Sequence, residues 1–352
     1  METLKQLSDR LEVVLTGWTN GVMAREADKR GFLVKQGRSE RSIIIESPSG
    51  RRLGFQNGRT RWNTLLARKV AKNKEATAAL LAAASVKVPE GHVFQKGEAT
   101  RAWEFARKWG LSVIKPVDSL QGRNVYAGLS DEATFRAAFN RVAENRGRVL
   151  VQEHISGVER RYLTVQGKVV AVSERRPASV LGDGVSTIQE LVDSKNLIRP
   201  PVHAPVPLDE QALELLQSEG KHAGTVPAAG ERVFLRRTLN TQQETTVGGA
   251  SPLLEARPVD EGGDFIDRTD EASPEAILVA ERAVKAVPGA RLIGLDMIEP
   301  SESDRPPTVI EINTSPMLAS HYFPAEGQSR DVAKDIIDAV FPSTVAAPSD
   351  SA

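Results

Sequence analysis

Two stretches, Leu292–Ile298 (LIGLDMI) and Thr308–Pro316 (TVIEINTSP), decide the fold of this chain. Both are apolar runs of strand length, and together they carry three side chains with oxygen ligands, namely Asp296, Glu311 and Asn313. Side chains alternate along a strand, so Glu311 and Asn313 are expected to face one side of a sheet while Ile310 and Ile312 enter the core. The pattern predicts neighbouring strands on which two carboxylates and one amide converge.

Such a cluster suits a hard cation. The chain has no cysteine and neither stretch contains histidine, so Mg²⁺ or Mn²⁺ fits these ligands better than zinc. A metal ion that accompanies a nucleotide phosphate is the first hypothesis. The alternative is that the three residues are polar positions on a solvated sheet face, and spacing alone leaves both interpretations open.

Composition limits the class of protein. A chain of 352 residues exceeds one usual hydrophobic core, so two or three subdomains are expected. Its 46 Lys and Arg residues equal its 46 Asp and Glu residues, which argues against a nucleic-acid or anionic-membrane partner and favours a small ligand. The lack of cysteine excludes disulfides, thiolate metal sites and thiol catalysis, and it fits a reducing compartment.

The N-terminal residues METLKQLSDR carry charges where a signal peptide needs an apolar stretch. No run reaches the roughly 18 apolar residues of a membrane span. We therefore expect a cytoplasmic protein that does not contact a membrane.

The mixture of expected helices and strands predicts an α/β (α+β) protein. We expect a small α/β subdomain over residues 1–65, the main domain over 66–342 and a disordered tail over 343–352. Asn73 is expected to cap a helix over 73–84, Ser186 and Gln189 to form a capping box, and Ser273 to begin a helix with Pro274. The other expected elements are strands at 41–46, 111–116, 125–129, 148–153, 160–166, 168–174 and 231–237, helices at 99–109, 131–145, 209–218 and 330–341, and loops at 118–124, 199–207 and 239–263.

Two lysines stand in positions that a bound anion would explain. Lys115 ends an apolar strand before a proline, where it can reach a phosphate as a point charge. Lys74 lies in the first turn of a helix, where a cation opposes the helix dipole. Taken singly, each is also compatible with a surface lysine.

The segment Gln152–Glu159 (QEHISGVE) joins a strand to the next hairpin and presents acids that could hold ribose hydroxyls. Taken in isolation, the segment fits a charged turn better than a binding site. His92, His203 and His222 have no partners at metal-ligand spacing and are interpreted as surface or structural residues.

Taken in order, these residues resemble the ATP-grasp superfamily, specifically the ligase module of cyanophycin synthetases and of the fused glutathione synthetases. The resemblance covers roughly residues 60–342 and implies an ATP-grasp fold with an N-terminal pre-grasp subdomain and a lid-bearing subdomain at about 110–155. The matching phrases are Asn73–Leu81, VIKP at Val113–Pro116, Val151–Glu159, RPASVLGDGVSTIQELVD at Arg176–Asp193, VPAAGERVFLR at Val226–Arg236, GLDMI at Gly294–Ile298 and IEINTSPMLASHYFP at Ile310–Pro324.

The resemblance also implies roles for individual residues. Asp296, Glu311 and Asn313 would bind two Mg²⁺ ions, with Mn²⁺ as an alternative metal. Arg176, with Arg161 as a weaker candidate, would stabilise an acyl phosphate or a tetrahedral intermediate. The ATP-binding residues would be Lys74 and Lys115 for phosphates, Ser119, Gln121 and Gly122 in the lid, Gln152, Glu153, His154 and Ile155 at the adenine hinge, and Glu159 for ribose. The substrate residues would be Arg236, Asn240, Ser315, Met317, Ser320 and His321.

Two departures from the family pattern bear on mobility and substrate choice. The family's lid carries three glycines, whereas this chain has Ser119, Gly122 and Asn124. In cyanophycin synthetases an asparagine runs into a Ser-Thr-Gly-Gly stretch, whereas here Asn240 is followed by TQQETTVGG.

No G-x-x-x-x-G-K-[ST] loop occurs, so a stand-alone ligase without the second half of cyanophycin synthetase is expected.

The expected activity is ATP-dependent amide formation between amino acids or short peptides through an acyl phosphate. The alternatives are a kinase of the same fold that phosphorylates a small molecule and a non-catalytic ATP-binding subunit. A requirement for an amine substrate would distinguish a ligase from a kinase. The sequence leaves open whether the protein forms a homodimer.

Overall fold

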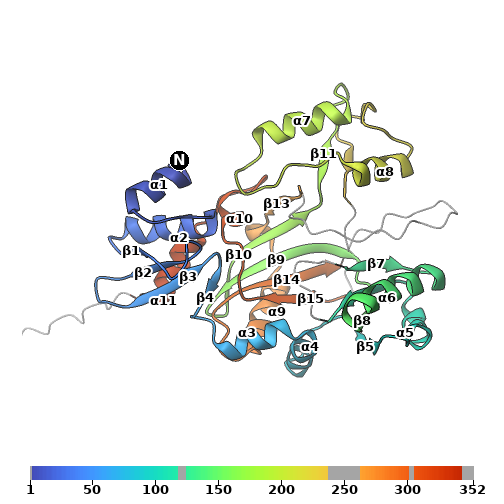
Figure 1. Ribbon diagram of the computed structural model, residues 1–352, viewed down its shortest axis with the longest axis horizontal. Coiled ribbons are helices and arrows are strands. Elements are labelled where there is room, and N and C mark those ends of the chain that lie inside the picture. The colour runs from blue at the N-terminus through green and yellow to red at the C-terminus, as the bar shows by residue number, and fades with distance from the viewer. Residues whose placement is uncertain (1, 118–123, 237–261, 301–304, 343–352) are drawn as a thin grey trace, which may run out of the picture.

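The computed structural model describes residues 2–117, 124–236, 262–300 and 305–342. A central five-stranded sheet separates an N-terminal subdomain at one end of the molecule from a second four-stranded sheet at the other, and a small helical subdomain lies beside them (Figure 1). None of the described helices combines the length and the apolar character that crossing a membrane requires.

The N-terminal subdomain packs two helices against one face of an antiparallel sheet of order β1-β2-β3-β4. Side chains alternate in burial along β2 and β3, so one face of each strand enters the core and the other stays open. The elements are α1 (Leu4–Leu11), α2 (Trp18–Lys29), β1 (Leu33–Gln36), β2 (Ile43–Glu46), β3 (Arg52–Gln56) and β4 (Arg59–Thr60).

Two helices lead out of this subdomain, α3 (Leu65–Lys72) and α4 (Lys74–Ala83). The Asn73 side chain accepts a hydrogen bond from the Ala76 amide, so the predicted cap of α4 is confirmed. No strand forms between this helix and Pro89. The next strand begins instead at Gly91, after the proline.

The second sheet has the order β5-β8-β6-β7, with α5 and α6 packed on its apolar face. Because β5 pairs with β8, this unit begins at Gly91 rather than near residue 110. Its elements are β5 (Gly91–Gln95), α5 (Ala99–Ala106), the 3₁₀ turn η1 (Arg107–Trp109), β6 (Ser112–Pro116), β7 (Tyr126–Leu129), α6 (Glu132–Arg146) and β8 (Arg148–Glu153).

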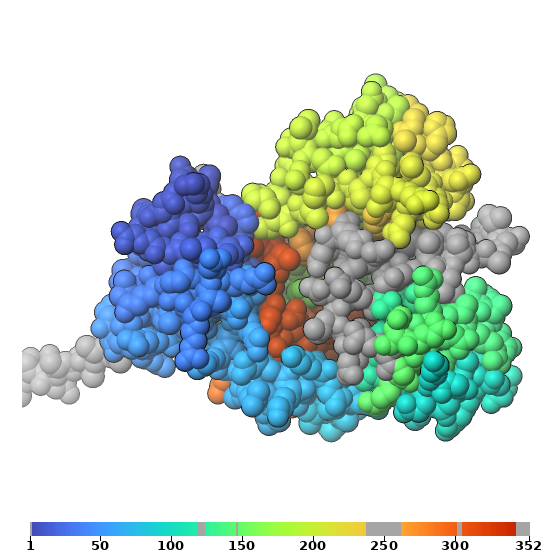
Figure 2. Space-filling view, viewed as in Figure 1, coloured from blue at the N-terminus to red at the C-terminus, as the bar shows by residue number. Residues whose placement is uncertain are grey.

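The central sheet has the order β13-β10-β9-β14-β15 and pairs antiparallel throughout. Helix α9 covers one face through small apolar side chains. On the opposite face, Leu163, Val165 and Leu292 pack against α11, and the rest of that face borders the hollow that Figure 2 shows between the blue, yellow and green parts of the surface. The elements are β9 (Gly157–Val165), β10 (Lys168–Arg176), β13 (Asp264–Asp267), η2 (Thr269–Glu271), α9 (Pro274–Lys285), β14 (Leu292–Pro300), β15 (Thr308–Asn313), α10 (Ala319–Tyr322) and α11 (Val332–Val340).

A β-bulge corrects one prediction about the two opening stretches. The register shifts between Asp296 and Met297, so that Met297 pairs with Val309 and Asp296 with Glu311. Ile310 is the extra residue of the bulge and stays partly exposed, while Val309 joins Ile312 in the core.

The small subdomain contains β11 (Ser179–Leu181), α7 (Ile188–Ile198), α8 (Glu210–Ser218) and β12 (Arg232–Phe234) around its own apolar cluster. The capping box of α7 is formed by Thr187 and Glu190, one residue later than the predicted pair Ser186 and Gln189. Ser186 is engaged elsewhere, because its amide and hydroxyl both donate to the Asp183 carboxylate.

Candidate active site

A row of charged residues crosses three strands of the central sheet. Arg161 on β9, Asp296 on β14 and Glu311 on β15 are direct cross-strand partners, so their side chains share one face. The Arg161 guanidinium grips Asp296 with two hydrogen bonds, Nε to Oδ1 at 2.6 Å and Nη2 to Oδ2 at 2.7 Å. The predicted convergence of Asp296 and Glu311 is therefore present in the structure.

Burial and the neighbouring arginines shift the pKa values of two buried carboxyl groups on this face in opposite directions. Burial alone would raise the pKa of Asp296, but the charges of Arg161 and Arg175 outweigh it and hold that pKa below its usual value. At Glu159, burial raises the pKa despite the opposing charges of Arg175 and Arg161. The effect of burial on the Glu159 pKa is therefore larger than the opposing effect of the two arginines.

Asn313 lies on the same face as Glu311, one alternation further along β15. Its side-chain oxygen accepts a hydrogen bond from the Ser315 amide at 2.8 Å, which shapes the turn that leaves the strand. Within the described ranges no group of three or more His, Cys, Asp or Glu side chains is arranged to hold a metal ion.

The donor set of Asp296, Glu311 and Asn313 nevertheless suits a magnesium ion, because all three supply hard oxygen ligands and bound phosphate can supply the rest. Both Asp296 oxygens are held by Arg161 in this structure. A metal ion there would share the carboxylate with Arg161 or displace it.

The two candidate phosphate lysines meet at one cavity. Lys74 from α4, Lys115 from β6 and Gln152 from β8 line it together with Glu311. Burial, and after it the charge of Lys74, lowers the pKa of Lys115 to about 8, while Glu311 opposes the shift. Strand alternation explains the position of Lys115, because its neighbour Ile114 points into the core of the second sheet.

The residues expected at the adenine hinge lie in different surroundings. Gln152 faces the lysine cavity and Ile155 is buried. The Glu153 side chain instead accepts a hydrogen bond from the Glu90 amide at 2.8 Å. The amides of Glu153 and His154 already donate to the carbonyls of Glu90 and Leu111.

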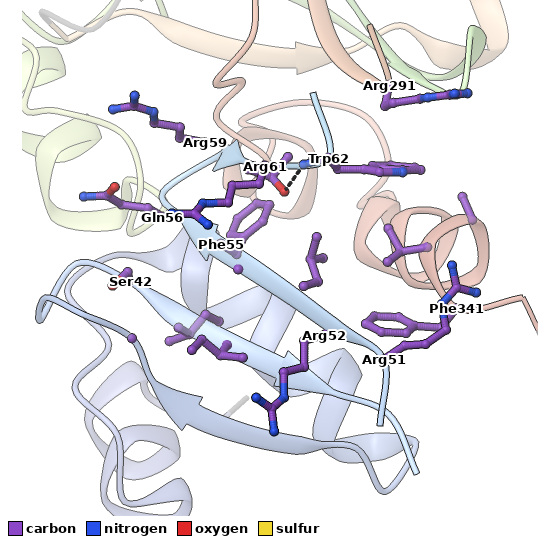
Figure 3. A pocket seen from close by; sticks show the side chains of 18 of the residues that line it. Ser42, Arg51, Arg52, Phe55, Gln56, Arg59, Arg61, Trp62, Arg291 and Phe341 are labelled. Carbon is purple, nitrogen blue, oxygen red and sulfur yellow. Dashed lines mark hydrogen bonds between the residues drawn. The ribbon is translucent and has the colours of Figure 1, made fainter. Parts of the chain in front are cut away.

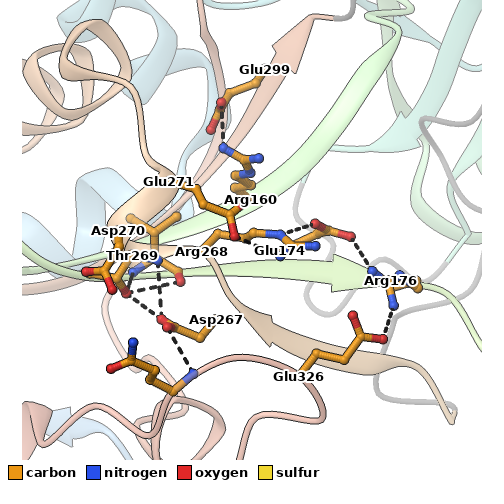
Figure 4. A network of polar contacts seen from close by, with 12 residues as sticks. Arg160, Glu174, Arg176, Asp267, Arg268, Thr269, Asp270, Glu271, Glu299 and Glu326 are labelled. Carbon is orange, nitrogen blue, oxygen red and sulfur yellow. Dashed lines mark hydrogen bonds and ion pairs between the residues drawn. The ribbon is translucent and has the colours of Figure 1, made fainter.

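Arg176 was the expected arginine of the site, but Arg175 is the one on the face of Asp296. Side chains alternate along β10, so the two neighbours point to opposite faces. The Arg175 Nη1 lies 3.2 Å from Glu159 Oε1 and 3.7 Å from Asp296 Oδ2. Arg176 contacts Glu174 and Glu326 on the other side of β10 (Figure 4).

The segment after β15 folds over the charged face. Ser320 is buried and its hydroxyl donates to the Met317 carbonyl at 2.7 Å. His321 is 3% exposed, and its Nε2 has no hydrogen-bond partner among the described residues. Burial, and after it the charge of Arg161, lowers the pKa of His321 to about 4, so this imidazole is neutral near pH 7.

An ion-pair network that the sequence did not predict holds this segment. Arg330 donates to Asp267 at 2.6 Å and to Asp270 at 2.7 Å, while its amide donates to the His321 carbonyl at 2.8 Å. Asp267 ends β13, and the network continues along β10 through Arg268 and Glu174 (Figure 4). In the sequence, the only indication of this network is the cluster of Asp264, Asp267 and Asp270 around Arg268.

The N-terminal subdomain touches the same segment. Gly58, in the turn between β3 and β4, has φ +89°, and a Cβ built there would collide with the Pro316 carbonyl oxygen. Glycine is therefore required both for the backbone angle and for the close approach.

The remaining candidates lie elsewhere. Arg236 is 8% exposed and forms a bidentate pair with Asp209, the N-cap of α8. Ser119, Gln121, Gly122 and Asn240 fall outside the described residues.

Comparison with known proteins gives consistent similarities, although no family model matches the chain. It is 30% identical over 354 residues to cyanophycin synthetase of Trichormus variabilis, covering 97% of this chain and 37% of that protein. It is 28% identical over 287 residues to the bifunctional glutathione biosynthesis protein GshAB of Clostridium perfringens, covering 77% of this chain and 34% of that one. The chain thus spans little more than a third of these relatives' length.

Among solved structures, the bifunctional glutathione synthetase of Pasteurella multocida superposes with a TM-score of 0.67 at 25% identity. The alignment covers 92% of this chain and 44% of that one. The similarity therefore extends over nearly the whole fold described above.

Proposed function

We propose, because this chain belongs to the ATP-grasp superfamily, that it is an ATP-dependent ligase that joins a carboxylate to an amine. A carboxylate oxygen attacks the γ-phosphorus of ATP and the bond to the β,γ-bridging oxygen breaks, which gives an acyl phosphate and ADP. The amine nitrogen then attacks the acyl carbon and loses a proton, and phosphate leaves with the electron pair of its bond to that carbon.

The observation that carries this proposal is the meeting of Lys74, Lys115 and Glu311 at one cavity, next to the row of Asp296 and Arg161. Cations at this buried place can position a triphosphate, and they can stabilise the negative charge that develops during phosphoryl transfer. The carboxylates can hold the metal ions that accompany it. Lys115 would bind the phosphates as a point charge, with Lys74 beside it.

ATP-grasp ligases use ATP with Mg²⁺. Asp296, Glu311 and Asn313 would hold two Mg²⁺ ions, or Mn²⁺, and the metal would neutralise charge on the transferred phosphoryl group. The protein needs no side chain as a nucleophile, because the carboxylate of the substrate attacks the γ-phosphorus directly. This agrees with a chain that contains no cysteine.

Arg161 and Arg175 are the arginines that we assign to the acyl phosphate and to the oxyanion of the second step. Both lie on the charged face, whereas Arg176 is engaged by Glu174 and Glu326. Arg161 would bind phosphate oxygens through its guanidinium fork if its hydrogen bonds to Asp296 were released.

The acceptor amine would enter over the segment that carries Ser315, Met317, Ser320 and His321. A neutral His321 can accept a proton or a hydrogen bond from the amine, which a permanently charged residue cannot. Arg236 and Asn240 stay candidates for the carboxylate substrate, and we propose amino acids or short peptides as both substrates.

The test is ADP release measured over pairs of amino acids and dipeptides, with mass detection of the product. Steady ADP release that requires an amine, together with an amide product, supports the ligase. Hydroxylamine should trap the acyl phosphate as a hydroxamate. Steady ADP release without any amine, with a stable phosphorylated product, would instead identify a kinase.

A further inference from the structure

A second, larger groove lies on the open face of the N-terminal sheet, away from the charged face described above (Figure 3). Its volume is about 1310 Å³. Burial alternates along β3, so Leu53 and Phe55 enter the core, while Gly54 and Gln56 face outward and line the groove. Residues at the end of α11 and at the start of β14 complete the wall.

The lining of this groove is strongly basic. Seven of the residues that line it are arginines and none is an Asp or Glu, although the whole chain has no net charge. Arg52 pairs with Glu46 at 2.8 Å. The other six have no ion-pair partner within the described part of the chain: Arg38, Arg51, Arg59, Arg61, Arg68 and Arg291.

These arginines are spread along the groove rather than gathered at one point. Figure 3 shows Arg61 beside Gln56 at one end and Arg51 beside Phe341 at the other, with Arg291 above. All but Arg68 are exposed, and the Nε of Arg68 is buried without a hydrogen-bond partner. Unpaired like charges repel one another, so a polyanion laid along the groove would relieve the repulsion.

The size and the lining indicate which polyanion fits. Pockets for small molecules measure about 300–1,000 Å³, so this groove can hold an extended chain. Single-stranded nucleic acid needs exposed aromatic rings for stacking, whereas Phe55 and Phe341 are buried here and Trp62 is half-buried. Guanidinium forks match carboxylates in planar, bidentate geometry.

We propose that this groove binds an acidic peptide segment in an extended conformation, with Arg51 and Arg61 holding carboxylates at its two ends. The site is separate from the proposed active site, because none of the ATP, metal or acceptor residues lines it. The inference therefore does not depend on the ligase activity.

The experiment is fluorescence anisotropy with a short fluorescein-labelled peptide of alternating Glu and Ser, at low ionic strength and without ATP. The control peptide carries Gln in place of Glu. The double variant Arg51→Gln/Arg61→Gln should weaken binding about tenfold or more, since two charge-assisted contacts are lost. Both positions are exposed and unpaired, so equal melting temperatures should accompany the loss.

The matched control variant is Arg107→Gln/Arg141→Gln, which removes two exposed arginines from the second sheet's subdomain and should bind as the native protein does. Rising salt should weaken the native interaction. Equal binding of the Gln peptide, equal affinity of the Arg51/Arg61 variant, tighter binding of an oligonucleotide of equal charge, or displacement by inorganic phosphate at the same charge concentration would each overturn the proposal.

Discussion

Arg161 holds both carboxylate oxygens of Asp296, while Asp296 stands directly across from Glu311 in the neighbouring strand. An internal cation thus occupies the carboxylate that we assign to a metal. Because a buried charge left without its partner is costly, either the arginine or a metal ion must accompany Asp296.

Replacing Arg161 tests this exchange. Arg161→Gln should lower the melting temperature in EDTA, because the buried Asp296 loses both guanidinium hydrogen bonds and keeps only Arg175 at 3.7 Å, at a cost of up to about 3–5 kcal/mol. Mg²⁺ without nucleotide should then raise the melting temperature of the variant more than that of the native protein. Arg160→Gln is the control, since it breaks the pair with Glu299 and leaves Asp296 untouched. Equal Mg²⁺ effects in all three proteins would contradict the exchange.

Glu311→Gln removes one anionic metal ligand and keeps the shape of the side chain. Turnover should fall by a factor of about 10² or more, while binding of ATP persists. Steady-state ADP release at saturating Mg²⁺ measures the effect. Near-native turnover would remove β15 from the proposed metal site.

Lys115→Ala should weaken binding of a non-hydrolysable ATP analogue by roughly 10- to 100-fold, the equivalent of one charge-assisted hydrogen bond. Lys72→Ala, which removes an exposed lysine at the end of α3, should change the affinity little. Calorimetric titration distinguishes the two outcomes. Unchanged affinity in Lys115→Ala would exclude this lysine from the phosphate site.

The same lysine predicts a pH dependence. Its pKa is about 8 in the unbound protein, and phosphate favours the charged form, so the affinity for the analogue should fall as the pH rises above 8. Lys115→Arg stays charged throughout this range and should lose the dependence. A native affinity that stays constant between pH 7 and 9 would contradict the assignment.

The two neighbouring arginines of β10 should respond differently. Arg175→Lys keeps the charge but loses the fork beside Glu159 and Asp296, so amide formation should fall about tenfold or more. Arg176→Lys should be mild, because its partners Glu174 and Glu326 lie on the other side of the strand. The opposite order of effects would restore Arg176 to the proposed site.

His321 predicts how stability depends on pH. Its pKa of about 4 in the folded chain lies below the usual value near 6.5, so the unfolded chain binds the extra proton between these limits. The free energy of unfolding should therefore decline as the pH falls from 6.5 towards 4, by up to a few kcal/mol from this residue. His321→Asn should flatten that part of the profile measured by urea unfolding. An unchanged slope would show that another group is responsible.

The sequence predicted local features well where one residue decides them. The ATP-grasp fold is confirmed, as are the helix starts at Asn73 and Ser273, because a side chain next to its own helix settles the outcome. Alternation and the adjacency of the two strands predicted that Asp296 and Glu311 lie on one face, as they do.

Features that depend on register or on distant partners could not be predicted in this way. The bulge beside Asp296 moves Ile310 out of the core, and no single-strand pattern reveals it. The choice of Arg175 over Arg176 depends on the register of β10 against β9, which places Arg175 near Glu159. The grip of Arg330 on Asp267 joins residues that are far apart in the sequence.

Gly58 has a consequence for protein engineering. Its close approach to Pro316 makes the first subdomain part of the wall that supports the proposed acceptor segment. A chimera joined near residue 65 would exchange that support together with the rest of the N-terminal subdomain, so its acceptor preference should follow the protein that supplies this subdomain. The hairpin around Gly58 is therefore a place to retune substrate choice without altering any residue that contacts ATP.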